Sequence, residues 1–335
     1  MPQGQLAQVL RGVLKPEDDR LIVGPSSIDD AGVVLLDERD GMGPGNSVAL
    51  VQTVDYFPPV VDDPYLYGAI AAANSLSDVY AMGGRAFTVL NLAGFPKDFP
   101  QEWITEIFRG GFDKVAEAGA IVAGGHTVQS AEAQFGFAVT GIVDRAKVTA
   151  NSGAKVGDVI YLTKALGMGT MTTSAKFNKI TWEEMKPAAL QMATLNDKAA
   201  LAMNQVTTHA CTDITGFGLA GHSHNIGKAS GVVLSFDTSS LPLFPRALEL
   251  ASAGGTSGGA KRGRAGLAEF VEVAEGLEDG LVNLVFDAET SGGLMILVPA
   301  AQAQQLESEL AARDQLVARI GEVEAGGAAT TVRFR

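Results

Sequence analysis

Residues 64–84 read PYLYGAIAAANSLSDVYAMGG, and this stretch predicts a long helix. Side chains such as Tyr67 and Ile70 recur at helical spacing through residue 82, and two consecutive glycines then provide the stop. Asn74 and Asp78 are one helical turn apart, so they share one face of this helix.

Strands are expected on both sides of this helix. Residues 47–54 are rich in β-formers and end at Asp55, which we therefore place at a strand end. Residues 87–92 form the next expected strand, a helical stripe follows over 104–118, and strict alternation predicts a further strand over 135–143. The apolar face of that last strand needs a partner sheet.

A polar, glycine-containing stretch over residues 144–157 marks the expected domain boundary. A second series of expected elements follows it: strands at 158–163, 232–236, 281–286 and 294–298, a helical stretch at 182–204, and loops at 166–173 and 254–266. Alternating strands and helices predict an α/β (α+β) protein, without the glycine fingerprints of the commonest nucleotide-binding folds.

The composition restricts the class of protein. With 46% apolar and 19% charged residues in 335, the chain is too hydrophobic for disorder. Acidic residues outnumber basic ones by 38 to 25, giving a net charge of -13, which disfavours binding to nucleic acid or to membrane surfaces. One cysteine excludes an intramolecular disulfide framework, and no stretch resembles a signal peptide or a membrane span, so we expect a cytoplasmic protein.

Several aspartates stand at expected element ends or in glycine-flanked loops: Asp29, Asp30, Asp55, Asp78 and Asp213. Dispersed carboxylates suit Mg²⁺, which is normally held by one or two carboxylates together with substrate phosphates. Residues 124–127, Gly-Gly-His-Thr, supply backbone N–H groups and a side-chain donor suited to phosphate oxygens. Taken singly, each of these features is also typical of an ordinary cap or turn.

His209, Cys211, His222 and His224 form a competing pattern that superficially resembles a zinc site. We disfavour zinc, because the spacing within each pair is tight and two helical residues two apart point in roughly opposite directions. Cys211 is interpreted as a small buried hydrophobe and not as a reactive thiolate.

Six blocks of sequence, taken together, are far more specific than any one motif. In chain order they are Asp29–Ala31, Thr53–Phe57, Ala72–Gly84, Ala123–Thr127, Thr212–Leu219 and Asp287–Leu294. This series resembles the selenide, water dikinase family, also called selenophosphate synthetases, and the likeness runs from about residue 2 to residue 335. The parts Asn74–Asp78 and Thr290–Gly293 are closer to this family than to its relatives.

The resemblance implies a two-domain fold of the aminoimidazole ribonucleotide synthetase-like superfamily, whose N-terminal domains pair into a β-barrel across a homodimer. It divides the chain into an N-terminal segment (1–26), an ATP- and Mg²⁺-binding dimerisation domain (27–150) and a C-terminal α/β domain (151–335). It implies that ATP, selenide and water give selenophosphate, AMP and orthophosphate.

The resemblance also implies roles for individual residues. Those at ATP-contacting positions are Ser27, Ile28, Asp29, Asp55 and Asp78, together with Gly124, Gly125 and His126, which reach the nucleotide from the partner subunit. Those at magnesium-binding positions are Asp30, Asp78 and Asp213. Because aspartates alone would repel a triphosphate, divalent metal must accompany the nucleotide.

Two departures from the family pattern stand out. The family carries a glycine-rich loop with a reactive cysteine or selenocysteine and then a lysine, at positions that precede Met1, so no catalytic residue of that loop is present and we expect this chain to be inactive as it stands. Gly263 occupies a position where the family usually has asparagine, which we interpret as a changed surface loop.

Two other functions compete with selenophosphate synthesis. The first is a non-catalytic, ATP-binding homodimer, either an inactive paralogue or a regulatory subunit. The second is a related superfamily kinase, such as thiamine monophosphate kinase, against which the Asn74–Asp78 and Thr290–Gly293 blocks argue.

Overall fold

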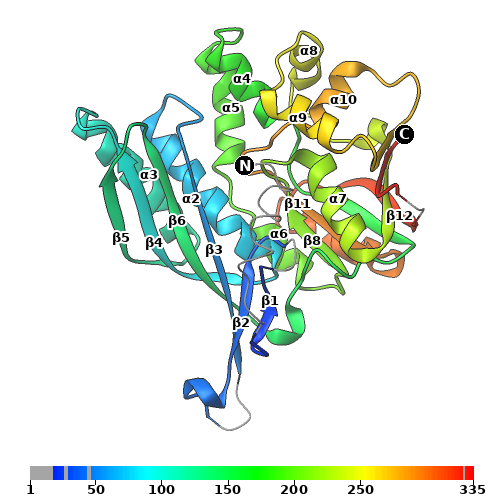
Figure 1. Ribbon diagram of the computed structural model, residues 1–335, viewed down its shortest axis with the longest axis horizontal. Helices are drawn as coiled ribbons and strands as arrows, with labels where there is room; N and C mark the ends of the chain where they lie inside the picture. The colour runs from blue at the N-terminus through cyan, green and yellow to red at the C-terminus, as the bar shows by residue number, and fades with distance from the viewer. Residues whose placement is uncertain (1–17, 26–28, 44–46, 327–328) are drawn as a thin grey trace.

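The computed structural model describes residues 18–25, 29–43, 47–326 and 329–335, and these form two β-sheets with helices packed on them (Figure 1). The first sheet has the strand order β1 (Leu21–Val23), β2 (Gly32–Leu36), β3 (Val48–Phe57), β6 (Gln134–Val143), β4 (Arg85–Phe95) and β5 (Ile121–Gln129). The second has the order β10 (Val271–Val273), β13 (Val332–Phe334), β9 (Val232–Phe236), β12 (Ala318–Ala325), β7 (Asp158–Leu162), β11 (Leu294–Pro299) and β8 (Ala210–Asp213).

Helices cover one face of the first sheet and both faces of the second. They are α2 (Pro64–Ala81), α3 (Gln101–Glu117), α4 (Met168–Lys176), α5 (Trp182–Met192), α6 (Asp197–Met203), α7 (Gly218–Ser230), α8 (Ala247–Ser252), α9 (Gly258–Gly266), α10 (Asp279–Val285) and α11 (Ala303–Ala311). α2 and α3 lie on the first sheet, whereas α7 and α10 lie on one face of the second sheet and α6 and α11 on the other. None of the described helices is long and apolar enough to cross a bilayer.

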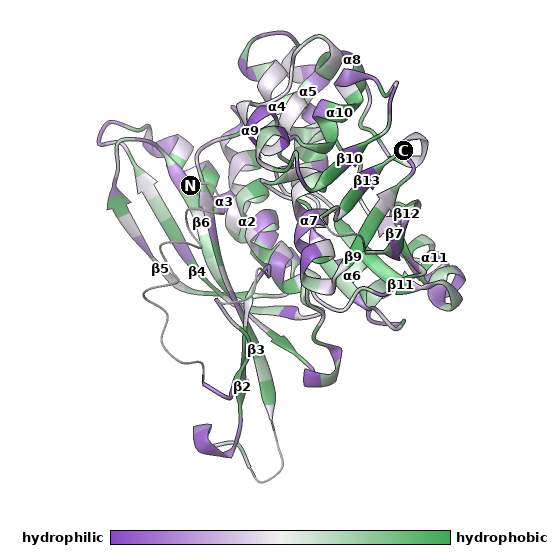
Figure 2. Ribbon diagram, turned by 45° about the vertical axis from the view of Figure 1, so that its right-hand side comes forward, coloured by the Kyte–Doolittle hydropathy of each residue, from purple (hydrophilic) through white to green (hydrophobic). Residues whose placement is uncertain are grey.

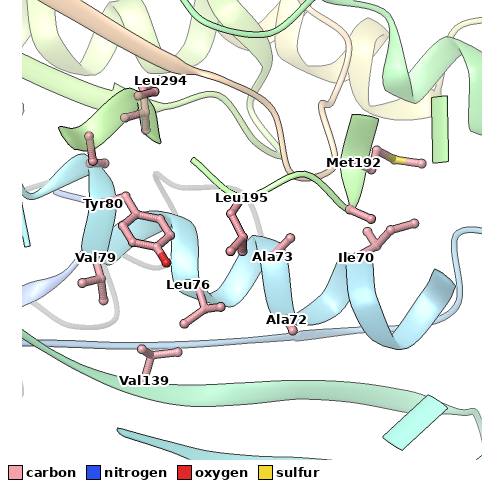
Figure 3. Close-up of a cluster of buried hydrophobic side chains, with 14 of the residues drawn as sticks. Ile70, Ala72, Ala73, Leu76, Val79, Tyr80, Val139, Met192, Leu195 and Leu294 are labelled. Atoms are coloured by element: carbon pink, nitrogen blue, oxygen red, sulfur yellow. The ribbon is translucent and has the colours of Figure 1, made fainter. Parts of the chain in front are cut away.

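The predicted helix over 64–82 is confirmed as α2, which occupies the centre of the molecule. Its start is capped by Asp63, whose carboxylate accepts a 2.9 Å hydrogen bond from the Leu66 amide. From Leu66 onward every residue of α2 is buried, as expected for a helix covered on all sides. Figure 3 shows Val79 of α2 facing Val139 of β6. α2 thus joins the cores of the two halves of the chain.

Glycines let α2 and α3 touch backbone to backbone. A Cβ atom added at Gly68 would lie 1.9 Å from the Ile107 carbonyl oxygen, and one added at Gly110 would lie 1.9 Å from the Tyr65 carbonyl oxygen. Only glycine fits at such distances. The close crossing places the helix pair flat against β6 and so positions the polar face of α2.

The placement of Asp55 at a strand end is wrong. β3 continues to Phe57, and it pairs with β6 over nearly its whole length, from Ala49 opposite Val143 to Phe57 opposite Phe135. Pairing with a long neighbour extends a strand beyond the run of β-formers that its own sequence shows. Asp55 therefore projects from the interior of a strand.

Three expectations for the second half of the chain are also wrong. The expected loop at 166–173 contains the start of α4, the expected loop at 254–266 contains α9, and the expected strand at 281–286 is α10. Gly263 accordingly lies in a helix and not in a surface loop. Short apolar runs do not distinguish strand from helix, and packing of α9 and α10 against neighbouring elements outweighs the low helix propensity of glycine.

The apolar face of the 135–143 strand does not need a partner sheet. Phe135, Phe137 and Val139 are buried under α2 and α3 of the same chain. The opposite face of the sheet carries the exposed apolar side chains instead: Val54 and Tyr56 on β3, Phe87 and Leu90 on β4, and Ile121 and Val128 on β5. We call these six residues the outer apolar face. Figure 2 shows apolar residues along β3, and these belong to both faces of the sheet.

Candidate functional site

Four of the predicted aspartates converge where the two sheets meet α2. They come from four different elements: Asp30 precedes β2, Asp55 is on β3, Asp78 is on α2 and Asp213 ends β8. Burial raises the pKa of Asp30, Asp55 and Asp78, and the negative charge of Asp213 raises all three further. We call these four residues the aspartate cluster.

Neighbouring polar side chains orient the members of the cluster. The Thr53 hydroxyl donates a hydrogen bond to Oδ2 of Asp78, and the Thr212 hydroxyl donates one of 2.8 Å to Oδ1 of Asp30. The Asn74 amide donates a 2.8 Å bond to Oδ2 of Asp55. A hydrogen-bonded carboxylate keeps a defined direction, so the cluster is preorganised.

The cluster has the chemistry of a magnesium site. Among the described residues, Oδ2 of Asp30 and Oδ2 of Asp213 are buried without a hydrogen-bond partner. Buried carboxylate oxygens without partners are costly, and a hard divalent cation satisfies them. Within the same described part of the chain, no three acidic, histidine or cysteine side chains are already close enough to chelate a metal by themselves. Substrate phosphates would supply the remaining ligands, as is usual for Mg²⁺.

Asp29 is a further predicted ATP-contacting residue, and it lies beside the cluster. The Asp29 carboxylate accepts hydrogen bonds of 3.2 and 3.3 Å from the Asn151 amide, and burial raises its pKa to about 6. Ser27 and Ile28 lie outside the described residues.

Gly124, Gly125 and His126 are not brought to the cluster within one chain. They lie on β5, the exposed edge strand of the first sheet, where His126 pairs with Leu92 of β4. β6 and β4 separate β5 from β3, which at normal strand spacing is a distance of about 14 Å. These residues would need a second subunit to reach a nucleotide held by a neighbouring cluster.

The histidines and the cysteine of the competing zinc pattern face different partners. His209 Nδ1 lies 2.8 Å from Oδ1 of Asp158, His222 Nε2 accepts a 3.1 Å bond from the Thr215 amide, and His224 Nδ1 lies 2.8 Å from the Thr331 hydroxyl. Cys211 is fully buried in the core, and burial raises the pKa of its thiol. Its interpretation as a small buried hydrophobe is confirmed.

Sequence reasoning missed Lys164, a buried lysine two residues beyond the end of β7. Its Nζ atom donates hydrogen bonds of 2.7 Å to the Thr194 carbonyl and 2.9 Å to the Ser291 carbonyl. Burial lowers the pKa of Lys164 to about 7, and the charge of Asp213 opposes this shift. The available signal was a lysine at the end of an apolar strand, where a charge is rarely buried without a partner.

We expect replacement of Asp55 by asparagine to stabilise the metal-free protein, and more so at high pH. Burial, then the charge of Asp213, raises the Asp55 pKa from 3.8 to about 7, against the hydrogen bond from Asn74. The folded state therefore binds more protons than the unfolded state between about pH 4 and pH 7, so stability falls as pH rises through that window.

Asp55→Asn removes this penalty and keeps an oxygen for Asn74. Its advantage over the wild type should grow by about 2 kcal/mol between pH 5 and pH 8. The measurement is denaturant unfolding in EDTA at both pH values. The control is Asp113→Asn, at an exposed position of α3. An advantage for Asp55→Asn that is equal at the two pH values would contradict the buried, charged cluster.

Comparison with known proteins assigns both halves of the chain. Models of the AIR synthase related protein family match residues 28–143 as the N-terminal domain and residues 155–333 as the C-terminal domain. Among solved structures, tt0281 from Thermus thermophilus has a TM-score of 0.74 at 21% identity, covering 99% of this chain and 96% of that one. AaThiL complexed with AMPPCP and TMP has a TM-score of 0.70 at 18% identity, with coverages of 99% and 93%. These two structures establish the fold.

Curated relatives are much more similar in sequence. The selenide, water dikinase of Treponema denticola is 43% identical over 92% of this chain and 84% of its own length. The enzyme of Caldanaerobacter subterraneus is 46% identical over 91% of this chain and 86% of its own length. The enzyme of Myxococcus xanthus is 43% identical over 96% of this chain and 90% of its own length. The chain therefore belongs to the selenide, water dikinase family of phosphotransferase enzymes.

Proposed function

We propose that this protein makes selenophosphate from ATP, selenide and water, releasing AMP and orthophosphate. The observation that carries the proposal is the aspartate cluster, which gathers four carboxylates from four elements in a chain 43% identical to a selenide, water dikinase. Such a cluster is unfavourable in an empty protein, because burial and mutual repulsion oppose its ionisation. It becomes favourable when divalent cations and phosphates occupy it.

Individual residues take separate roles in this proposal. Asp30, Asp78 and Asp213 would hold Mg²⁺, which supplies positive charge to the triphosphate and to the developing charge of phosphoryl transfer. Asp29 and Asp55, with Ser27 and Ile28, would contact the nucleotide. Thr53 and Thr212 hold two of the carboxylates in place through the hydrogen bonds described above. Phosphoryl transfer requires little else of a protein than positioning and charge stabilisation.

The test of this function is ³¹P NMR of ATP, Mg²⁺ and selenide with the purified protein. Because the family resemblance implies a loop with a cysteine or selenocysteine and a lysine, the assay uses the 335-residue chain and the same chain extended at its N-terminus by such a loop. We expect both proteins to bind Mg²⁺ and ATP, and selenophosphate to accumulate with the extended one. ATP binding without selenophosphate from either protein would favour the non-catalytic alternative.

We also infer a homodimer formed through the first sheet. Tyr56 and Leu90 are 55% and 49% exposed on the outer apolar face, and exposed contiguous apolar surface of this kind is typical of an interface. The whole of β5 is solvent-accessible and its outer edge is unpaired within the described sheet. In a dimer through this sheet, Gly124, Gly125 and His126 of one subunit would reach the nucleotide of the other.

The dimer is tested by placing charges on the outer apolar face. The double variant Tyr56→Glu with Leu90→Glu should sediment as a monomer and bind Mg²⁺ and ATP about tenfold more weakly, since a buried charge opposes association. Trp103→Glu, at an exposed aromatic residue of α3, should stay dimeric. A wild-type protein that is monomeric at micromolar concentration with full nucleotide affinity would refute the dimer.

The division into segments 1–26, 27–150 and 151–335 and the cytoplasmic location remain predictions from the sequence. Neither affects the roles proposed for the cluster.

A further inference from the structure

We propose that Lys164 is a positioning residue for the aspartate cluster, acting across the two halves of the chain through the loop Thr290–Gly293. The inference rests on the proposed Mg²⁺ and nucleotide site and adds a residue to it that neither the sequence motifs nor the family resemblance assigned. Lys164 lies two residues beyond the end of β7 in the second sheet, whereas Asp55, the carboxylate that it positions, lies on β3 of the first.

A continuous series of hydrogen bonds connects Lys164 to Asp55. Lys164 Nζ donates a hydrogen bond of 2.9 Å to the Ser291 carbonyl, and the Ser291 amide donates one of 2.9 Å to Oδ1 of Asn74. Asn74 Nδ2 in turn donates 2.8 Å to Oδ2 of Asp55. Asn74 uses both ends of its amide, so its orientation follows from the position of Ser291. Movement of the Ser291 backbone would rotate the donor away from the Asp55 carboxylate.

The loop itself is held in a costly conformation. Ser291 has a φ angle of 51°, in the left-handed region, which is unfavourable for residues that have a side chain. A Cβ atom at Gly292 would lie 2.2 Å from the Ile214 carbonyl oxygen, and one at Gly293 would lie 2.4 Å from the Lys164 amide nitrogen. The loop therefore packs tightly between the ends of β7 and β8. Hydrogen bonds from neighbouring residues must offset the backbone strain at Ser291.

The buried side chain of Lys164 provides hydrogen bonds of this kind. Besides Ser291, its ammonium group binds the Thr194 carbonyl at 2.7 Å, so it ties the loop to the segment after α5. Asn196 makes a second link, with its amide 2.8 Å from both the Gly292 carbonyl and the Ser77 hydroxyl of α2. Without Lys164 the carbonyl of the buried residue Ser291 would lose its donor, and the loop would relax away from Asn74.

The test compares Lys164→Met, which keeps the apolar stem, with Thr170→Val as a matched control. Thr170 is also buried, and its hydroxyl donates a hydrogen bond of 2.8 Å to Asp287 next to the same loop, but it does not take part in the hydrogen-bond series to Asn74. Both variants should lose thermal stability. Only Lys164→Met should speed amide exchange at Ser291 and weaken Mg²⁺-dependent ATP binding, by about tenfold for a lost charge-assisted contact.

A double-mutant cycle separates positioning from general destabilisation. If Lys164 acts through Asn74, then Lys164→Met, Asn74→Ala and the double variant should all weaken binding by about the same factor, whereas independent effects would multiply. Multiplicative effects, or unchanged binding and exchange in Lys164→Met, would overturn the proposal. If Lys164→Met does not fold, Lys164→Gln is used, and failure of both to fold would show a purely structural role. Wild-type protein that binds no ATP with Mg²⁺ would instead refute the proposed function, and amide exchange would still test the hydrogen-bond series.

Discussion

Asp78→Asn should strongly weaken Mg²⁺-dependent ATP binding while making the metal-free protein more stable. Asp78 lies on α2, fully buried by neighbours, and burial and then the charges of Asp213, Asp55 and Asp30 raise its pKa. Asparagine keeps an oxygen for the Thr53 hydroxyl but removes one charge from this repulsive group. We expect affinity to fall on the order of 100-fold, or about 2.7 kcal/mol, and the melting temperature in EDTA at pH 8 to rise.

Opposite signs for binding and stability distinguish a functional cluster from a structural one. The control is Cys211→Ser, at a fully buried residue of β8 two positions before Asp213. A hydroxyl buried there should cost about 1–3 kcal/mol of stability, with little change in affinity. Calorimetric titration and thermal unfolding give both quantities. If Asp78→Asn lost stability and kept its affinity, the cluster would be structural.

Gly292→Ala should both destabilise the protein and weaken nucleotide binding. The new Cβ would lie 2.2 Å from the Ile214 carbonyl oxygen, so either the loop or the end of β8 must move. Asp213 directly precedes Ile214, and the Ile214 amide donates 2.9 Å to the Gly293 carbonyl, so the displacement reaches the cluster. Overpacking against a backbone costs about 1–3 kcal/mol, and we expect a loss of about tenfold in affinity.

The matched control for that change is Gly266→Ala. Gly266 ends α9 with nothing within 4 Å of an added Cβ, so alanine there should be neutral or slightly stabilising. Urea unfolding and ATP titration of both variants provide the comparison. Equal behaviour of the two alanine variants would mean that the loop at Ser291 tolerates displacement and does not position the cluster.

The sequence alone determined the central helix, the family and the residues of the cluster. α2 was predictable because its period and its glycine stop are local signals within residues 64–84. The aspartates were candidates because dispersed carboxylates suit Mg²⁺, and their combination with the other blocks, in the chain order of one family, singled them out. The assignment did not need to know how far apart the residues lie in space.

Tertiary structure alone decided how those residues are arranged and what supports them. Asp55 lies within a strand because β6 pairs with β3 over nearly its full length, a contact between residues about eighty positions apart. α9 and α10 are helices because packing outweighs weak local preferences. Lys164 is hydrogen-bonded to Ser291, 127 positions away, and the free face of the first sheet is the one that its own helices leave uncovered. Such contacts are decided by the folded chain as a whole, because burial and pairing act between segments that no local pattern connects.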